Sequence, residues 1–128
     1  MKRFGWSKGN PVWLDLEPYA YLPDNFAAQI YAAAWVKEIR RLGYIPGIYA
    51  RLPFLLLMHK MASGRPDQIW LDDGLHFKKI DHHIDINHIP GLSIHTYPGA
   101  VRVWQYGGFK NRGRSFDLNF ANCKFARL

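Results

Sequence analysis

The chain has 128 residues, and its 17 Lys and Arg residues against 10 Asp and Glu residues give a formal net charge of +7. A chain of this length accommodates one domain, and 48% hydrophobic with 16% aromatic residues excludes a disordered protein, which lacks the apolar surface needed to fold. No apolar run reaches the ~20 residues of a membrane-spanning helix, and a single cysteine, Cys123, excludes an internal disulfide framework.

The first predicted element is a strand over residues 12–17, which Pro18 ends. Alternate residues of a strand point to opposite faces, so two sets of side chains are expected. Val12, Leu14 and Leu16 share one face, and Trp13, Asp15 and Glu17 share the other.

A helix is predicted from Asp24 to Leu42, with Asp24 or Asn25 as its N-cap and Gly43 just past its end. Polar residues fall on one side, and the opposite side is apolar, which is typical of a helix lying on a sheet. The predicted apolar face consists of Ala28, Tyr31, Ala32, Trp35, Ile39 and Leu42.

Four further strands and a second helix complete the predicted order. The strands are expected at residues 44–50, 69–72, 101–106 and 116–120, and the helix at residues 53–63. Pro46 weakens the first of these strands, since proline cannot donate to a ladder, and Gly107-Gly108 is expected to end the strand 101–106. Because strands alternate with helices, the order predicts an α/β fold built from parallel βα units. Residues 74–100, rich in His, Pro and Gly, are expected to form a loop or an insertion.

Asp15 and Glu17 are the first candidates for catalysis. Two carboxylates at positions i and i+2 of a strand point the same way, about 6–7 Å apart along the chain. They stand at the carboxyl end of their strand, where the active sites of parallel α/β folds assemble. Glycoside hydrolysis needs one carboxylic acid that protonates the leaving oxygen and a second group that supports the developing positive charge or a water. The structural alternative is that both acids bind loop backbone or basic neighbours.

The last predicted strand repeats this geometry with Asp117 and Asn119. Aromatic residues near strand ends can stack on a sugar ring, although they also serve as ordinary core residues. The residues near strand ends are Tyr49, Trp70, Trp104, Gln105 and Tyr106.

The segment from His82 to His88 contains His82, His83, Asp85 and His88, and imidazole and carboxylate groups are good metal ligands. Their spacing matches no established ligand motif. We therefore expect neither a metal ion nor an organic cofactor.

Basic residues gather near both ends of the chain, where they would attract an anionic partner or serve solubility alone. They are Lys2, Arg3, Lys8, Lys110, Arg112, Arg114, Lys124 and Arg127. Because no nucleic-acid-binding signature is present, nucleic acid is a minor alternative as partner. The basic amino terminus lacks the apolar stretch of a signal peptide, so we expect a cytoplasmic protein as the sequence stands, or an exported one if an upstream segment is missing.

Five motifs stand in a familiar order over nearly the whole chain: Pro-Val-Trp-Leu-Asp-Leu-Glu at 11–17, Gly-Tyr-Ile-Pro-Gly-Ile-Tyr at 43–49, Asp-Gln-Ile-Trp-Leu at 67–71, Val-Trp-Gln-Tyr at 103–106 and Phe-Asp-Leu-Asn at 116–119. Together they resemble the C-terminal half of the glycoside-hydrolase-like (β/α)-barrel proteins. That group includes the family 25 lysozymes (muramidases) and a related bacterial glycoside-hydrolase-like family of unknown function.

The resemblance implies a partial (β/α)8 TIM-barrel-like domain over residues 1–128 that lacks the N-terminal half of the barrel. About five parallel strands with helices would correspond to barrel strands four to eight. The implied activity is lysozyme-like hydrolysis of glycosidic bonds between the amino sugars of bacterial cell-wall peptidoglycan.

The resemblance also implies roles for individual residues. Glu17 would be the general acid, and Asp15 and Asp117 would complete the catalytic set by holding the N-acetyl group of the sugar or a water. The residues expected to bind substrate are Tyr49, Trp70, Gln105, Tyr106 and Asn119. The sequence Leu71-Asp72-Asp73 departs from the family, in which small residues follow the tryptophan.

Two alternatives remain open beside hydrolysis. One is a catalytically inactive glycan-binding or structural remnant of the same fold, and the other is a basic nucleic-acid-binding accessory protein. An incomplete barrel would also leave unpaired strand edges, so a homo-oligomer formed through the open sheet edge is expected.

Overall fold

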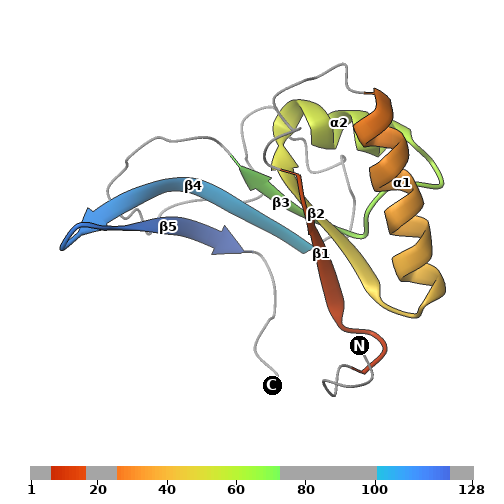
Figure 1. Cartoon of the computed structure of the whole chain (residues 1–128), viewed down its shortest axis with the longest axis horizontal. Helices are drawn as coiled ribbons and strands as arrows, with labels where there is room; N and C mark the ends of the chain where they lie inside the picture. Colours follow the sequence, from red (N-terminus) through yellow and green to blue (C-terminus); the bar gives the residue numbers. More distant parts are fainter. Residues whose placement is uncertain (1–6, 17–25, 73–100, 122–128) are drawn as a thin grey trace.

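The computed structural model describes residues 7–16, 26–72 and 101–121 (Figure 1). They form β1 (Pro11–Asp15), α1 (Phe26–Arg41), β2 (Ile45–Arg51), α2 (Leu52–Lys60), β3 (Gln68–Asp72), β4 (Val101–Asn111) and β5 (Arg114–Ala121). Several predictions concern residues outside the described ranges: the acid Glu17, the N-cap at Asp24 or Asn25, the segment 74–100 with its histidines, and Cys123.

The five strands form one sheet in the order of the sequence, β1-β2-β3-β4-β5. The first four strands are parallel, and α1 and α2 connect β1 to β2 and β2 to β3. The predicted α/β class with parallel βα units is therefore confirmed for these strands.

The fifth strand differs from the prediction because β5 runs antiparallel to β4. Asn111 pairs with Arg114 across a tight turn, whose central residues Arg112 and Gly113 have φ values of 49° and 78°. A two-residue turn joins antiparallel strands, whereas a parallel pair needs a crossover of a dozen or more residues. Gly107 and Gly108 do not end β4, which continues to Asn111 after a register irregularity between Gln105 and Gly107.

Both helices pack on the same face of the sheet. Consecutive parallel strands joined by right-handed crossovers place their helices on one side, and Figure 1 shows α1 and α2 grouped together at the end of the molecule away from the β4–β5 hairpin. The core between the helices and the sheet contains Leu16, Ala28, Ala32, Ala33, Val36, Ile48, Ala50, Phe54, Leu55, Met58, Ile69 and Leu71. Neither helix has the length and apolar character needed to cross a membrane, in the part of the chain that is described.

The buried face of α1 is rotated from the predicted one. Tyr31 and Leu42, predicted to be buried, are 56% and 38% exposed, whereas Ala33 and Val36 are buried instead. The helix thus turns its smallest side chains toward α2 and the loop after it. Gly64 in that loop lies directly against Ala33, and only small residues permit so close an approach.

The predicted end of α1 at Gly43 is confirmed. Gly43 has φ +87°, its N–H donates to the Arg40 carbonyl at 2.9 Å, and the Tyr44 N–H donates to the Ile39 carbonyl at 3.1 Å. This pair of bonds is a Schellman motif, which satisfies carbonyls that the last helical turn leaves without partners. The chain thereby reverses directly into β2.

Pro46 is tolerated inside β2, although we expected it to weaken this strand. The residue is fully buried, and its carbonyl accepts a hydrogen bond from the Asp67 N–H at 2.9 Å. The strand is held on both sides, by β1 and by β3, so one missing donor leaves most of the ladder intact.

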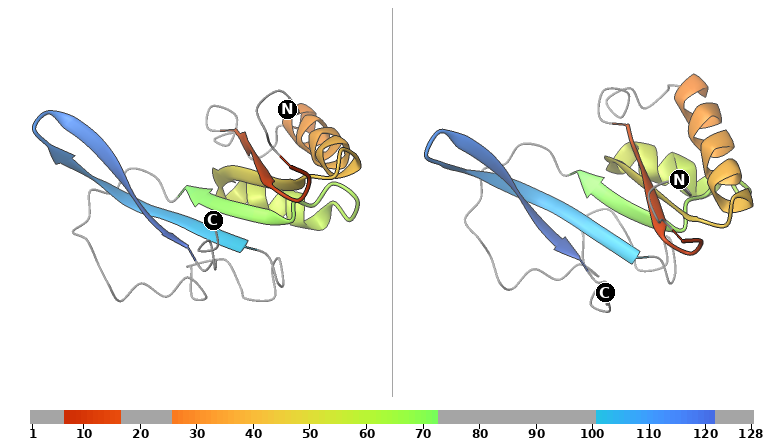
Figure 2. Two further views of the ribbon diagram at one scale, coloured as in Figure 1. Left: turned by 90° about the horizontal axis from the view of Figure 1, so that it is seen from below. Right: turned by 60° about the horizontal axis from the view of Figure 1, so that its bottom comes forward.

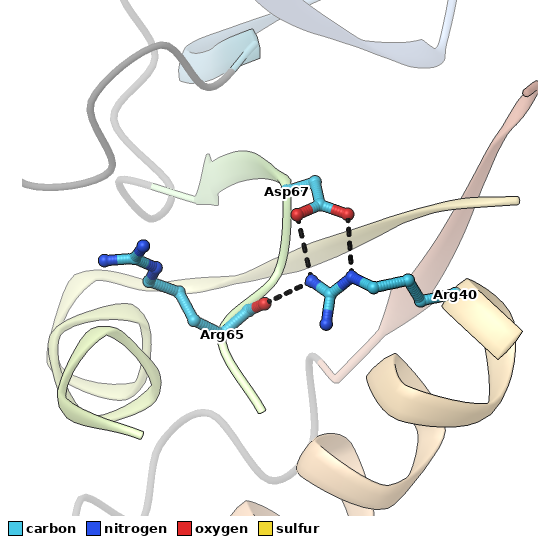
Figure 3. A network of polar contacts seen from close by, with 3 residues as sticks. All are labelled: Arg40, Arg65 and Asp67. Carbon is cyan, nitrogen blue, oxygen red and sulfur yellow. Dashed lines mark hydrogen bonds and ion pairs between the residues drawn. The ribbon is translucent and has the colours of Figure 1, made fainter. Parts of the chain in front are cut away.

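Arg40 ties the end of α1 to the segment that leads into β3 (Figure 3). Its guanidinium donates to both carboxylate oxygens of Asp67, at 2.9 and 3.4 Å, and to the Arg65 carbonyl at 2.9 Å. The two side chains are 43% and 46% exposed, so the ion pair contributes at most about 1 kcal/mol. It orients the loop more than it stabilises the fold.

Replacing Gly64 with alanine tests the close approach between α1 and this loop. The new Cβ would touch the Ala33 Cβ and come within 2.9 Å of its Cα, so we expect a loss of about 1–3 kcal/mol in the free energy of unfolding, measured by chemical denaturation. The neighbouring exposed variant Ser63→Ala should be neutral. Adding Ala33→Gly should recover part of the loss, and a Gly64→Ala protein as stable as wild type would contradict the packing described.

Candidate functional site

The face of the sheet opposite the helices carries aromatic, acidic and amide side chains in register. Residues paired across neighbouring strands point to the same face, and three rows of such residues cross the sheet. From the amino to the carboxyl end of the parallel strands, these rows are Trp13-Gly47-Gln68, Asp15-Tyr49-Trp70-Val103 and Arg51-Asp72-Gln105-Asn119. The predicted separation of Trp13 and Asp15 from Leu14 and Leu16 is therefore confirmed.

A cavity of about 330 Å³ lies on this face. Its volume is at the lower end of the range that small-molecule sites occupy, ~300–1,000 Å³. All five strands contribute to its lining, which consists of Trp13, Asp15, Tyr49, Trp70, Gln105 and Asp117. The cavity therefore combines three aromatic rings with two carboxylates and one amide.

The three rings pack edge to face around Trp70. The centroid of its ring lies 5.8 Å from that of Trp13 and 5.3 Å from that of Tyr49, at interplanar angles of 85° and 73°, a favoured arrangement for aromatic pairs. Trp13 and Trp70 stand on β1 and β3, and Gly47 between them on β2 has no side chain to separate them. A Cβ at Gly47 would lie 2.5 Å from the Trp13 ring.

Hydrogen bonds join two of these rings to amides on the hairpin. Tyr49 Oη donates to Gln105 Oε1 at 2.8 Å, and Trp70 Nε1 donates to Asn119 Oδ1 at 2.9 Å. Each amide uses its oxygen as the acceptor, and its NH2 group is a hydrogen-bond donor. The strands β2 and β3 are thus coupled to β4 and β5 through the site itself.

Arg51 and Asp72 form an ion pair at the carboxyl end of this face. Arg51 Nε lies 3.4 Å from Asp72 Oδ2, and the Asp72 side chain is only 10% exposed. A buried carboxylate is costly unless it is paired, so the guanidinium offsets the burial of Asp72. Asp72 is also the register partner of Gln105, which places the pair next to the cavity.

The structure brings most of the predicted site residues together. Asp15, Tyr49, Trp70, Gln105 and Asp117 line the cavity, and Asn119 contacts it through Trp70. Glu17 lies outside the described residues, and so does the side chain of Tyr106, whose backbone belongs to β4. Trp104, the remaining aromatic candidate, packs against the core on the helix side.

Four residues of this face were missed by the sequence reasoning. Trp13 was placed on the correct face but given no role, although its position two residues before Asp15 on one strand was the available signal. Gly47 was passed over beside Pro46, and Arg51 and Asp72 carried no motif, because their pairing depends on the register between β2 and β3.

No three His, Cys, Asp or Glu side chains gather as a metal site within residues 7–16, 26–72 and 101–121. Comparison of the chain with protein-family models, with curated proteins and with solved structures finds no match. A function for this chain is therefore inferred from the side chains that line the cavity.

The contact between Gly47 and Trp13 can be tested by Gly47→Ala. The added methyl group should displace the Trp13 ring and cost about 1–3 kcal/mol in the free energy of unfolding, with a shift in tryptophan fluorescence that reports the altered cluster. In a Trp13→Ala background the same substitution should cost much less. Equal losses of stability in the two backgrounds would show that the absence of a side chain at Gly47 is not needed to accommodate the Trp13 ring.

Proposed function

We propose that the chain is a glycoside-hydrolase-like domain that binds bacterial cell-wall glycan in the cavity and hydrolyses the glycosidic bond between its amino sugars. The observation that carries this proposal is the combination of Trp13, Tyr49 and Trp70 with Asp15 and Asp117 in one cavity. Aromatic rings and carboxylates together suit a ligand that is apolar on its ring faces and polar around its edge, as a sugar is.

The hydrogen-bonding groups of the cavity support a sugar as its ligand. The carboxylates of Asp15 and Asp117 accept hydrogen bonds from hydroxyl groups or an amide N–H. The NH2 group of Gln105, whose oxygen is used by Tyr49, donates to a hydroxyl or carbonyl oxygen. A pyranose carrying an acetamido group offers both kinds of partner.

We further propose that this sheet belongs to a partial (β/α)8-barrel-like architecture. Sequential parallel strands with both helices on one face support it, since the barrel is built in this way. In a flat sheet the edge strands β1 and β5 would lie about 19 Å apart, from four spacings of ~4.8 Å. Asp15 and Asp117 on these strands line the same cavity, which fits a sheet that curves toward its helix-free face. The antiparallel β5 departs from an all-parallel barrel.

In the proposed reaction, Glu17 donates a proton to the glycosidic oxygen as the bond from this oxygen to the anomeric carbon breaks. The leaving sugar departs as an alcohol, and Asp15 or Asp117 stabilises the positive charge on the remaining ring. The oxygen of a water molecule then bonds to the anomeric carbon, and the proton that this water loses returns to the Glu17 carboxylate. One water is consumed for each bond cleaved.

The catalytic part is tested on purified peptidoglycan by the release of reducing ends. We expect Glu17→Gln to lower kcat by about 100-fold or more, the usual contribution of a general acid, and Asp15→Asn and Asp117→Asn to lower it as well. Glu38→Gln, which removes an exposed carboxylate from α1 on the opposite side of the sheet, is the matched control. Activity unaffected by Glu17→Gln, or absent from wild type, would remove hydrolysis and leave the glycan-binding alternative.

The binding part is tested separately with soluble chito-oligosaccharides and titration calorimetry. Trp70→Ala should weaken binding about five- to tenfold, because contacts of one aromatic ring contribute on the order of 1 kcal/mol. Tyr31→Ala, which removes an exposed ring from α1, should leave the affinity unchanged. Equal affinities of the Trp70→Ala variant and wild type would place the glycan elsewhere.

A further inference from the structure

The β4–β5 hairpin extends well beyond the rest of the sheet. Residues 101–105 of β4 pair with β3, whereas residues 107–111 pair, among the described residues, only with β5. Figure 2 shows the resulting two-stranded ribbon projecting away from α1, α2 and the three shorter strands in both views. We call residues 107–117 the β-arm.

The tip of the β-arm is basic and exposed. Arg112, Gly113, Arg114 and Ser115 are exposed, and Lys110 precedes them in β4. Residues 107–116 contain no Asp or Glu, and within the described part of the chain neither Arg112 nor Arg114 has an ion-pair partner. The tip is therefore a local concentration of positive charge with exposed guanidinium groups.

The backbone conformation of Arg112 is a second, independent indication that the positive charge at the tip serves in binding. Its φ of 49° lies in the left-handed region, which is favourable for Gly, Asn and Asp but disfavours other side chains. Arginine thus weakens the turn that it occupies, and its exposed side chain adds no packing. Residues held in such conformations are concentrated at functional positions.

The β-arm is continuous with the cavity. Asp117 lines the cavity from β5. Arg114 precedes it by three residues, about 10 Å along the strand at ~3.3 Å per residue, and therefore leaves the opposite face of the strand, whereas Arg112 stands in the turn that ends the ribbon. A polymer that occupied the cavity and ran along β5 would meet Arg112 at the turn and would reach Arg114 where it passes around the tip. This continuity favours a charged glycan over nucleic acid as the partner, because one ligand then engages both features.

We propose that the β-arm binds the carboxylate groups of an acidic cell-wall glycan whose sugar ring occupies the cavity, with Arg112 and Arg114 as the contacting residues. This proposal rests on the proposed function, and it adds that the substrate is an anionic polymer. A guanidinium group matches a carboxylate in geometry and can donate two parallel hydrogen bonds to it.

The test compares wild type with the double variant Arg112→Asn/Arg114→Gln in pelleting assays on purified peptidoglycan sacculi. Asparagine is favoured in the left-handed turn, so this variant should fold at least as stably as wild type, checked by its Tm. Lys37→Gln/Arg65→Gln, which removes two exposed charges elsewhere, is the matched control for net charge.

We expect the double variant to bind sacculi about 25-fold more weakly, from about fivefold for each cation near an anionic surface. Its binding should also depend less on salt, with the log–log slope reduced by about two. On sacculi whose carboxylates have been amidated, and on neutral chito-oligosaccharides, it should match wild type.

Three results would overturn the proposal: unchanged binding by the double variant, an equal loss in the control variant, or a loss confined to a 20-base-pair DNA duplex, which would identify a nucleic-acid arm. Failure of the proposed function itself is distinguishable. In that case neutral oligosaccharides would neither bind nor be cleaved, although wild type and the double variant could still differ on untreated sacculi.

Discussion

The structure depends on the burial of one face of the sheet beneath two helices. Because β1, β2 and β3 follow one another in both sequence and space, their crossovers deliver α1 and α2 to the same side. Leu16, Ile48 and Ile69 supply the sheet side of the resulting core. The opposite face carries no helix in the part of the chain that is described, and there Trp13, Asp15, Tyr49 and Trp70 line the cavity. One constraint thus separates the residues that stabilise the fold from those that form the cavity.

The cavity in turn depends on the hairpin. Tyr49 and Trp70 are oriented by the amides of Gln105 and Asn119, which stand on β4 and β5. The tight turn at Arg112 and Gly113 returns the chain antiparallel, and this return brings Asp117 to the lining of the cavity. A fifth parallel strand would have needed a further crossover helix before it could place an acid there. The departure from the expected topology is therefore the feature that completes the site.

Much of this arrangement was predictable from the sequence, because strand alternation and helix caps are local signals. The strand around Asp15, the end of α1 at Gly43 and the strand that carries Trp70 all follow from neighbouring residues. What was missed depends on contacts between elements. The pairing of Arg51 with Asp72 requires the register of β2 against β3, and the rotation of α1 that exposes Tyr31 follows from the fit of Ala33 against Gly64. Gly107-Gly108 was interpreted as a strand end, although glycine is also typical of an irregular position within a strand.

The structure distinguishes arginines that are paired with carboxylates from arginines that are exposed at the tip of the hairpin. The chain has a net charge of +7, and Arg40 and Arg41 in its middle part form ion pairs with Asp67 and Glu38. The hydrogen bond from Arg41 lowers the pKa of Glu38, so this carboxylate stays ionised to a lower pH than an unpaired glutamate. The arginines at the tip of the β-arm differ, because Arg114 begins the strand that also carries Asp117 and Arg112 stands in the turn before it. The hairpin thus carries one carboxylate at the cavity and two cations at its tip. Such a gradient would align an anionic chain along β5, with its charges at the tip and a neutral ring over Trp70.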